Sequence, residues 1–270
     1  MILSKRVQLH GVQLDEIDYR IVIRSVEPGT PKKNTSAVNR MMGVGQRITG
    51  DHWESLETVV TWAVDIPKEQ MSDRRTVFAA VAAWANAGGW LAISEMPNRY
   101  MYVDRVVIDS PGDYWDWTKD YKITFKAYNV PFWQGDLNTV QLYGATNTWT
   151  VTTEGHEKSI VDATYSNLSG AVVNNILFKV DQVDSWGNVY RISTIKLTDV
   201  GLGGSDVLTV SHGTDGILRI TATGKDGGYL MKCLDISSTD DLYLPVGSYR
   251  LGFEADRYGE TRFTWRGRWL

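Results

Sequence analysis

Cysteine and histidine are scarce in this chain of 270 residues, which has one cysteine, Cys233, and four histidines, at positions 10, 52, 156 and 212. A single cysteine excludes a disulfide within the chain, and the scattered histidines lack the close spacing of zinc ligands. Cys233 lies in the apolar stretch YLMKCL, so we expect it to be buried as a small hydrophobic side chain. The sequence therefore predicts neither a metal site nor a cofactor.

Long apolar runs are also lacking. No stretch approaches the roughly 20 apolar residues of a membrane-spanning helix, and the N-terminal MILSKRVQLHGVQLDEIDYR is too rich in charges for a signal peptide. The part up to Gly135 has as many basic as acidic residues, and the acidic excess of the remainder gives the net charge of -4. We expect a soluble protein made in a cytoplasm, without membrane insertion and without a basic surface for nucleic acid.

Motifs for catalysis are absent as well. The chain contains no G-x-S-x-G elbow, and the glycine-rich GLGGSD at 201–206 lacks the lysine and the helix N-terminus of a phosphate-binding loop. A triad assembled from distant Ser, His and Asp residues stays open as a minor alternative. We therefore predict that the protein is not an enzyme.

Acidic residues beside aromatic ones offer a second alternative. Two carboxylate pairs could serve sugar cleavage, Asp240 with Asp241 and Asp113 with Asp116. The second pair lies in DYWDW, where Trp115 and Trp117 could hold a sugar ring on an aromatic platform with the acids beside it. This pattern would suit a carbohydrate-binding module or a glycoside hydrolase. A loop that packs its Trp and Tyr side chains on the domain surface or against a neighbour is the simpler interpretation, because exposed aromatics mark contacts of all kinds.

Strand patterns fill most of the chain. RVQLHGVQL, YRIVIRSVE and LETVVTWAVDI alternate apolar and polar residues, as half-buried strands do. Between the second and third of these, residues 28–50 are polar, contain the basic residues Lys32, Lys33 and Arg40, and are too many for a hairpin turn. We predict that this segment is an arm that contacts a neighbouring subunit.

One convincing helix is predicted, over residues 73–87, with Gly88 as its C-terminal stop. Its apolar stripe consists of Val77, Phe78, Val81 and Trp84. A stripe of this kind packs on a sheet, so the helix should cover one end or face of a β-sandwich or barrel. A hairpin follows, in which Pro97 and Asn98 form the turn before the strand RYMYVDRVVID.

The second half of the chain shows strands about ten residues apart, separated by glycine-rich breaks, which is typical of a two-sheet sandwich. VQLYG, TWTVTT, GGYLMKCLDI, GSYRLGFEAD and TRFTWRGRW are among the predicted strands. Pro131, Phe132 and Trp133 end the preceding strand, and we interpret them as the hinge between two domains. The predicted domains are residues 1–135 and 136–270.

The order of these elements resembles the distal tail (Dit) proteins of siphophages. The likeness rests on the helix ending in AGG, the hairpin EMPNRYMYVDRVV, the strand end NVPFWQG, and the later NVYRISTIKLTDVG, LPVGSYRL and FTWRGRWL. It covers nearly the whole chain, although LPVGSYRLGFEAD is more compact than the corresponding family segment. The resemblance implies a ring-forming N-terminal domain followed by a galectin-like antiparallel β-sandwich.

The resemblance also implies a function. Members of this family form hexameric rings at the tail tip, between the tail tube protein and the tail-tip or baseplate proteins, and DNA passes through the lumen during ejection. A heterologous contact repeated about a rotation axis can close such a ring. On this basis we expect a structural protein of the virion that is assembled in the host cytoplasm.

Overall fold

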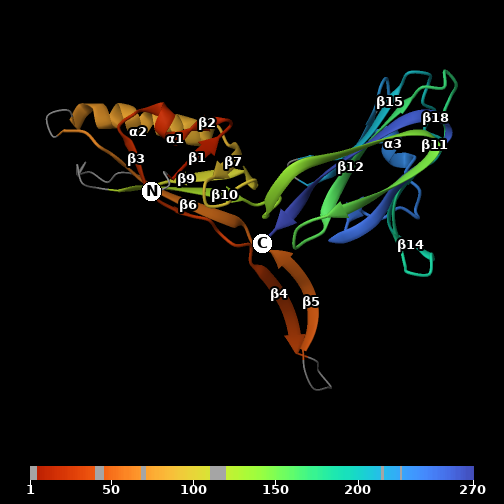
Figure 1. The fold of residues 1–270 in the computed structure, drawn as a ribbon, viewed down its shortest axis with the longest axis horizontal. Helices are drawn as coiled ribbons and strands as arrows, with labels where there is room; N and C mark the ends of the chain where they lie inside the picture. Colours follow the sequence, from red (N-terminus) through yellow and green to blue (C-terminus); the bar gives the residue numbers. More distant parts are fainter. Residues whose placement is uncertain (1–4, 40–45, 68–70, 110–119, 214–215, 226) are drawn as a thin grey trace. The chain divides into compact units, whose positions relative to one another are not determined.

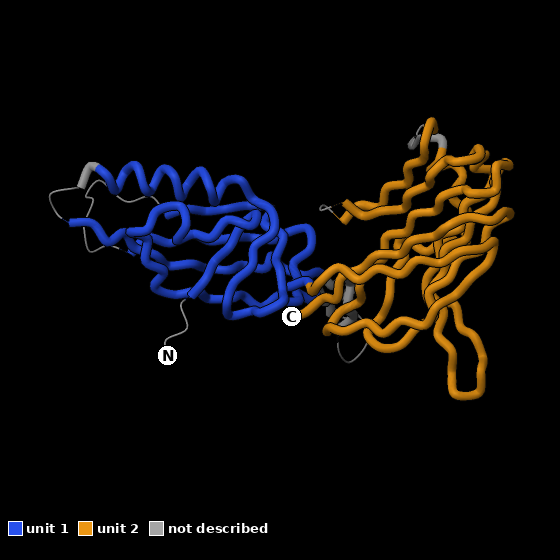
Figure 2. The backbone as a smooth tube through the Cα atoms, turned by 45° about the horizontal axis from the view of Figure 1, so that its top comes forward, with its two compact units in different colours: residues 1–134, 270 blue, residues 135–269 orange. Residues whose placement is uncertain are grey.

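The computed structural model describes residues 5–39, 46–67, 71–109, 120–213, 216–225 and 227–270. It is a mainly β protein whose strands pair antiparallel, as the sequence predicts. The chain divides into two compact units, which are described one at a time (Figure 2). Unit 1 comprises residues 1–134 and residue 270, and unit 2 comprises residues 135–269. The domain boundary predicted from the sequence lies between residues 135 and 136.

Over its described residues, unit 1 contains two sheets, a ribbon and two helices (Figure 1). Its elements are β1 (Val7–Leu9), β2 (Val12–Gln13), α1 (Leu14–Ile17), β3 (Ile21–Glu27), β4 (Lys33–Asn39), β5 (Gln46–Trp53), β6 (Leu56–Val64), α2 (Met71–Asn86), β7 (Gly89–Ile93), β8 (Tyr100–Val103), β9 (Arg105–Ile108) and β10 (Tyr121–Ala127). One sheet has the order β3-β6-β10-β9, and the other β2-β1-β7-β8, joined at β8 by the first residues of β11 (Trp133–Thr153). The predicted strand RVQLHGVQL is instead the β1–β2 hairpin followed by α1, because His10 and Gly11 take positive φ angles and turn the chain.

Part of the core of unit 1 lies between helix α2 and one face of the β3-β6-β10-β9 sheet, and the other sheet adds buried residues such as Leu9, Leu91 and Met101. Every second residue of β10 is buried, and Tyr121 lies directly opposite Trp62 of β6. The ring of Phe78 stacks on Trp62 with centroids 6.0 Å apart. Trp84 meets the ring of Phe125 edge-on at the same distance. The apolar stripe predicted from the sequence therefore does face a sheet.

Helix α2 differs from the prediction in its bounds and in the depth of its tryptophan. It runs from Met71 to Asn86 instead of 73–87, and Gly88 follows with a φ of 65°, which suits a C-terminal stop. Val77 and Val81 are fully buried, whereas Trp84 is half-buried. Its indole N–H reaches the edge of the core and donates to the carbonyl of Val12 at 3.2 Å.

The β7–β8 hairpin turns at Pro97 and Asn98, both of which are exposed. Asn98 takes a φ of 59°, a left-handed conformation that asparagine tolerates better than most residues. The N–H of Met96 donates to the carbonyl of Ile93, and the N–H of Arg99 donates to that of Met96, each at 3.2 Å. These bonds make the corner a compact turn.

Unit 2 is an antiparallel sandwich. After β11 it contains β12 (Ser159–Asn167), β13 (Ile176–Val183), β14 (Val189–Leu197), β15 (Val207–His212), β16 (Leu218–Ala222), α3 (Gly227–Lys232), β17 (Tyr243–Leu244) and β18 (Gly247–Trp269). Two predictions fail here. The predicted strand GGYLMKCLDI contains helix α3, and β11 and β18 each cover two predicted strands.

Strand β18 contributes to both layers of the sandwich. Its residues 250–255 pair with β13, and its residues 259–265 pair with β12. Across the core, Phe178 of β13 meets Phe263 of the second segment edge-on at 6.0 Å. The rings of Tyr165, on β12, and Phe253, in the first segment, lie 6.2 Å apart. The two pairings thus face one another, and Cys233 is buried beside them as expected. A specific likeness to galectins stays a prediction.

Candidate interaction surfaces

The arm predicted at residues 28–50 contains a β-ribbon in unit 1. Strands β4 and β5 pair with each other, from Lys33 opposite Trp53 to Asn39 opposite Gln46, with a register shift between Ser36 and Ala37. Among the described residues they pair with no other strand, so they form a separate two-stranded sheet (Figure 1). Such a ribbon has two free edges, each presenting backbone donors and acceptors to a partner.

Aromatic side chains hold the base of this ribbon on unit 1. The ring of Trp53 packs edge-on against Phe132 with centroids 5.1 Å apart. Trp133 is completely buried, and its indole N–H donates to the carbonyl of Gly29 at 3.1 Å. At Gly29 an added Cβ would lie 1.9 Å from the carbonyl oxygen of Glu57, so no other residue fits this close approach of two backbone segments.

The three residues interpreted as a hinge therefore belong to unit 1. Pro131, Phe132 and Trp133 are all buried, and the last two contact the segments that enter and leave the ribbon. Sequence reasoning missed this role because Gly29 and Trp133 are 104 residues apart. Their action as a hinge stays a prediction.

Of the three basic residues predicted in the arm, the structure describes Lys32 and Lys33. Lys32 is exposed, and its carbonyl accepts from the N–H of Glu54 at the base of the ribbon. Lys33 is also exposed and places its ammonium 5.9 Å from the ring centroid of Trp53. Arg40 lies outside the described residues, as do Trp115 and Trp117, the indoles of the sugar-binding alternative.

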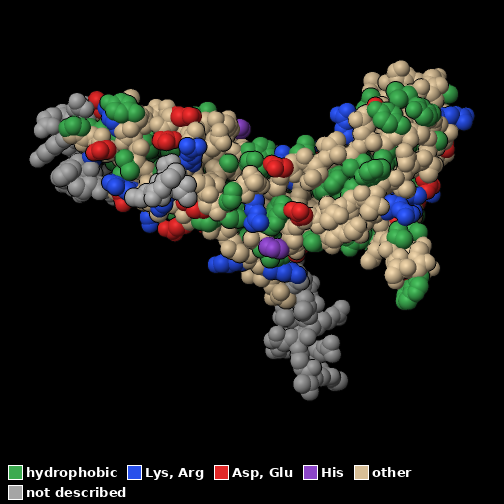
Figure 3. Space-filling view, in the orientation of Figure 1, with side chains coloured by type: hydrophobic (Ala, Val, Ile, Leu, Met, Phe, Trp, Pro, Cys, Tyr) green, Lys and Arg blue, Asp and Glu red, His purple; other side chains and the backbone are tan. Residues whose placement is uncertain are grey.

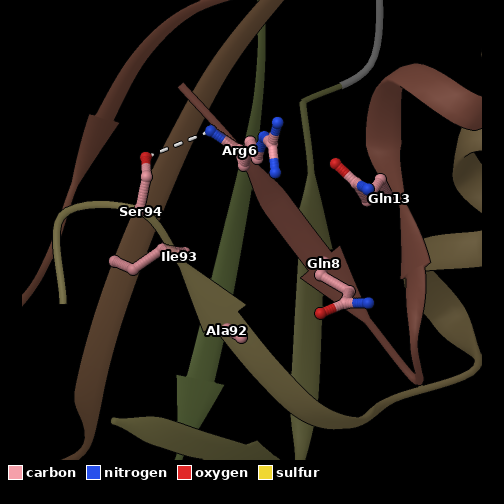
Figure 4. A pocket seen from close by; sticks show the side chains of 6 residues that line it. All are labelled: Arg6, Gln8, Gln13, Ala92, Ile93 and Ser94. Carbon is pink, nitrogen blue, oxygen red and sulfur yellow. Dashed lines mark hydrogen bonds between the residues drawn. The ribbon is translucent and has the colours of Figure 1, made fainter. Parts of the chain in front are cut away.

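Charged side chains of both signs are interspersed over the visible face of unit 1 (Figure 3). An open pocket of about 340 Å³ beside β1 and β7 is lined by Arg6, Gln8, Gln13, Ala92, Ile93 and Ser94 (Figure 4). Several of its polar groups are already engaged in hydrogen bonds with nearby residues. The N–H of Arg6 donates to the Ser94 hydroxyl at 3.1 Å, and the Gln8 amide donates to the carbonyl of Gly11 at 2.8 Å.

An acidic and imidazole cluster in unit 2 joins Asp241, one of the candidate carboxylates, to residues that the sequence predictions did not bring together with it. The two ring nitrogens of His212, at the end of β15, lie 3.1 Å from carboxylate oxygens of Asp162 and Asp241. Burial lowers the pKa of the neighbouring Arg268 to about 10, although Asp241 and Glu157 act in the opposite direction. The His212 side chain is 6% exposed, whereas those of Asp162 and Asp241 are 40% and 33% exposed. The cluster ties β12, β15 and the segment before β17 together.

Sequence offers no signal for this cluster, because its members are 50 and 29 residues apart. Within the described ranges, no group of three or more His, Cys, Asp or Glu side chains is arranged to hold a metal ion. In the same part of the chain, no helix has the length and apolarity to cross a membrane.

Similarity to known proteins appears in structure and not in sequence. No protein-family model and no curated protein matches the chain. Its structure is similar to SPP1 Dit (gp 19.1), described as a paradigm of the hub adsorption apparatus in phages infecting Gram-positive bacteria. The two share 14% of their residues, with a TM-score of 0.65 over 98% of this chain and 99% of the other. This chain has the Dit fold.

Two structures of the phage P2 baseplate in its activated conformation also match. The one with Ca covers 98% of both chains at 10% identity with a TM-score of 0.47, and the one with Sr covers 97% of both chains at 10% identity with a TM-score of 0.46. The Dit fold confirms the predicted resemblance at the level of architecture, in both units. The aromatic and turn residues that suggested it, such as Trp133 and Asn98, have definite structural places in that fold.

Proposed function

We propose that this protein is a structural hub of a bacteriophage tail tip, which joins the tail tube to the baseplate or host-adsorption apparatus. The observation that carries the proposal is the Dit fold, which extends over 98% of the chain and includes both units. A structural and non-enzymatic role goes with it. Within this proposal, the contacts of His212 with Asp162 and Asp241 are structural ties between segments of unit 2.

The finer proposal is that unit 1 forms a hexameric ring. The β4–β5 ribbon supports it, because an element that leaves the sheets of its own unit is suited to reach the next copy. Its anchoring by Trp53, Phe132 and Trp133 gives it a defined base. Each contact of a stable ring should bury more than about 1,000 Å².

The proposed partners are further copies of the chain, the tail tube protein, and tail-tip or baseplate proteins. DNA would pass through the ring lumen only in transit, which agrees with the interspersed charges of unit 1 (Figure 3). The protein would reside in the virion after assembly in the host cytoplasm. The carbohydrate-binding or hydrolase alternative based on Trp115 and Trp117 rests on residues outside the described ranges.

Gold-labelled antibodies against the purified chain test its place in the particle. Electron microscopy of phage particles that encode the chain should show gold at the distal end of the tail. Labelling of the capsid, or particles that never contain the chain, would refute the proposal.

Native mass spectrometry of the full chain tests the ring. Six copies of the 30.4 kDa chain should give a species of about 182 kDa. The double substitution Lys32→Glu and Lys33→Glu at the base of the ribbon should reduce this species, because it reverses the charge of a predicted contact. Arg105→Glu, an exposed change on β9, is the matched control and should leave it unchanged. Dimers as the largest species, both alone and with tail tube protein, would contradict ring formation but not the hub role.

A further inference from the structure

Unit 2 contains an open pocket that the proposed hub function does not use. Its volume is about 510 Å³, and it is lined by Thr148, Trp149 and Thr150 of β11 and by Arg250 of β18. A volume of this size falls within the range of small-molecule sites. Trp149 is 59% exposed although it lies within a strand of the sandwich. Burial in the core therefore does not explain this tryptophan.

One of the cationic side chains around the pocket, that of Arg250, has no acidic partner among the described residues. In the pairing of β13 with its two neighbours, Asp181 stands directly opposite both Arg191 and Arg250. Asp181 is only 3% exposed, and its carboxylate forms an ion pair with the guanidinium of Arg191. Two residues away, Lys179 is paired with Glu254. Among the described residues no ion pair engages Arg250, so the uncompensated positive charge lies at the pocket.

These residue types together match an acidic sugar. A guanidinium donates two parallel hydrogen bonds to a carboxylate or phosphate, which an ammonium cannot do in the same geometry. The negative face of the Trp149 indole attracts the polarised C–H groups of a sugar ring.

We propose that this pocket binds an acidic saccharide, with its ring against Trp149 and its carboxylate or phosphate on Arg250. The inference rests on the pocket alone and is independent of the hub function. A second exposed tryptophan, Trp186, differs from Trp149 because no cationic side chain lies beside it in its turn. Trp186, 87% exposed at the tip of the β13–β14 hairpin, has no cation in its turn, and the nearby Asp184 carboxylate accepts from the N–H groups of Trp186 and Asn188.

Titration calorimetry of the full chain with defined probes tests the proposal. Trigalacturonate carries the carboxylate, glucose 6-phosphate carries the phosphate, and maltotriose is the neutral reference. Trp149→Ala and Arg250→Gln remove the two main contacts, and Arg250→Lys retains the charge without the planar fork. Trp186→Ala and Arg105→Gln are matched controls that remove an exposed indole and an exposed guanidinium elsewhere. Trp149 is largely exposed, so its replacement leaves the fold intact even if an Arg250 variant does not fold.

Binding of either acidic probe, weakened about tenfold or more by Trp149→Ala and Arg250→Gln and less by Arg250→Lys, is the expected result. The controls should change the affinity by less than about twofold, and added salt should weaken binding. The probe that binds better identifies the carboxylate or the phosphate as the natural anion. Three results would overturn the proposal: no binding at about 10 mM of either acidic probe, equal affinity for maltotriose, or inorganic phosphate binding as tightly as glucose 6-phosphate.

Discussion

Replacement of Trp133 by alanine is the sharpest test of how unit 1 holds its ribbon. The side chain is completely buried, and its indole N–H donates to the carbonyl of Gly29. A buried tryptophan removes about 150–250 Å² from water, which corresponds to roughly 4–6 kcal/mol at 25 cal/mol per Å². Measured losses for such truncations are about 3–5 kcal/mol, because surrounding groups relax into the cavity. We expect Trp133→Ala to lower the free energy of unfolding of unit 1 by about 4 kcal/mol.

Scanning calorimetry is the suitable assay, because two compact units can give separate transitions. For a unit of this size, 4 kcal/mol corresponds to a fall in melting temperature of roughly 10 °C or more, confined to the transition of unit 1. Trp133→Phe keeps most of the ring and loses the hydrogen bond, so it should cost about 1–2 kcal/mol. Limited proteolysis should also cleave within residues 33–53 faster in Trp133→Ala. Trp186→Ala, which removes an exposed indole, should change neither readout. If Trp133→Ala left the unit 1 transition in place, the described anchoring would be wrong.

Three further predictions concern other parts of the fold. Trp84→Ala should cost about 2–3 kcal/mol in urea unfolding, less than Trp133→Ala, because Trp84 is half-buried; equal losses would contradict this order. Gly29→Ala should destabilise unit 1 by about 3 kcal/mol or more, since its Cβ would overlap the carbonyl of Glu57. Gly11→Ala should cost about 1 kcal/mol, because an added Cβ there meets open space and only the φ of 81° opposes it. Similar melting temperatures for the two variants would refute the clash at Gly29. The hydroxyl and N–H of Ser237, together with Lys196, lower the pKa of Asp235 from 3.8 to about 2. Its stabilising contribution is therefore present above pH 4 and is lost as the pH falls toward 2, so the stability difference between the wild-type protein and Asp235→Asn should shrink between pH 5 and pH 2; a difference independent of pH would contradict it.

Local patterns predicted the elements whose burial is regular. The alternation in Tyr121–Ala127 and the stripe of Val77 and Val81 correspond to a strand and a helix that face the same core. These predictions succeed because a strand or helix on one side of a core repeats its burial every two or every three to four residues. Asn98 likewise revealed the β7–β8 turn through its tolerance of a left-handed backbone.

Features that depend on distant residues could not be predicted in this way. GGYLMKCL has apolar residues suited to either type of element, and tertiary packing selects helix α3. The burial of Trp133 against Gly29, the junction at His212, and the charge left at Arg250 all arise from pairings between separate strands and loops. Such contacts can be recognised from the residue types only when the pairing of the strands is already known.

Because β18 pairs with both β12 and β13, it affects how unit 2 unfolds locally. Amides of β12 and of β13 are both bonded to one continuous segment, residues 250–265. Detaching either layer exposes part of the same segment, so hydrogen exchange in the two layers should require one common opening instead of two separate ones. Unit 2 would then transmit a pulling force as a single block, and a load on one layer would be borne by the other.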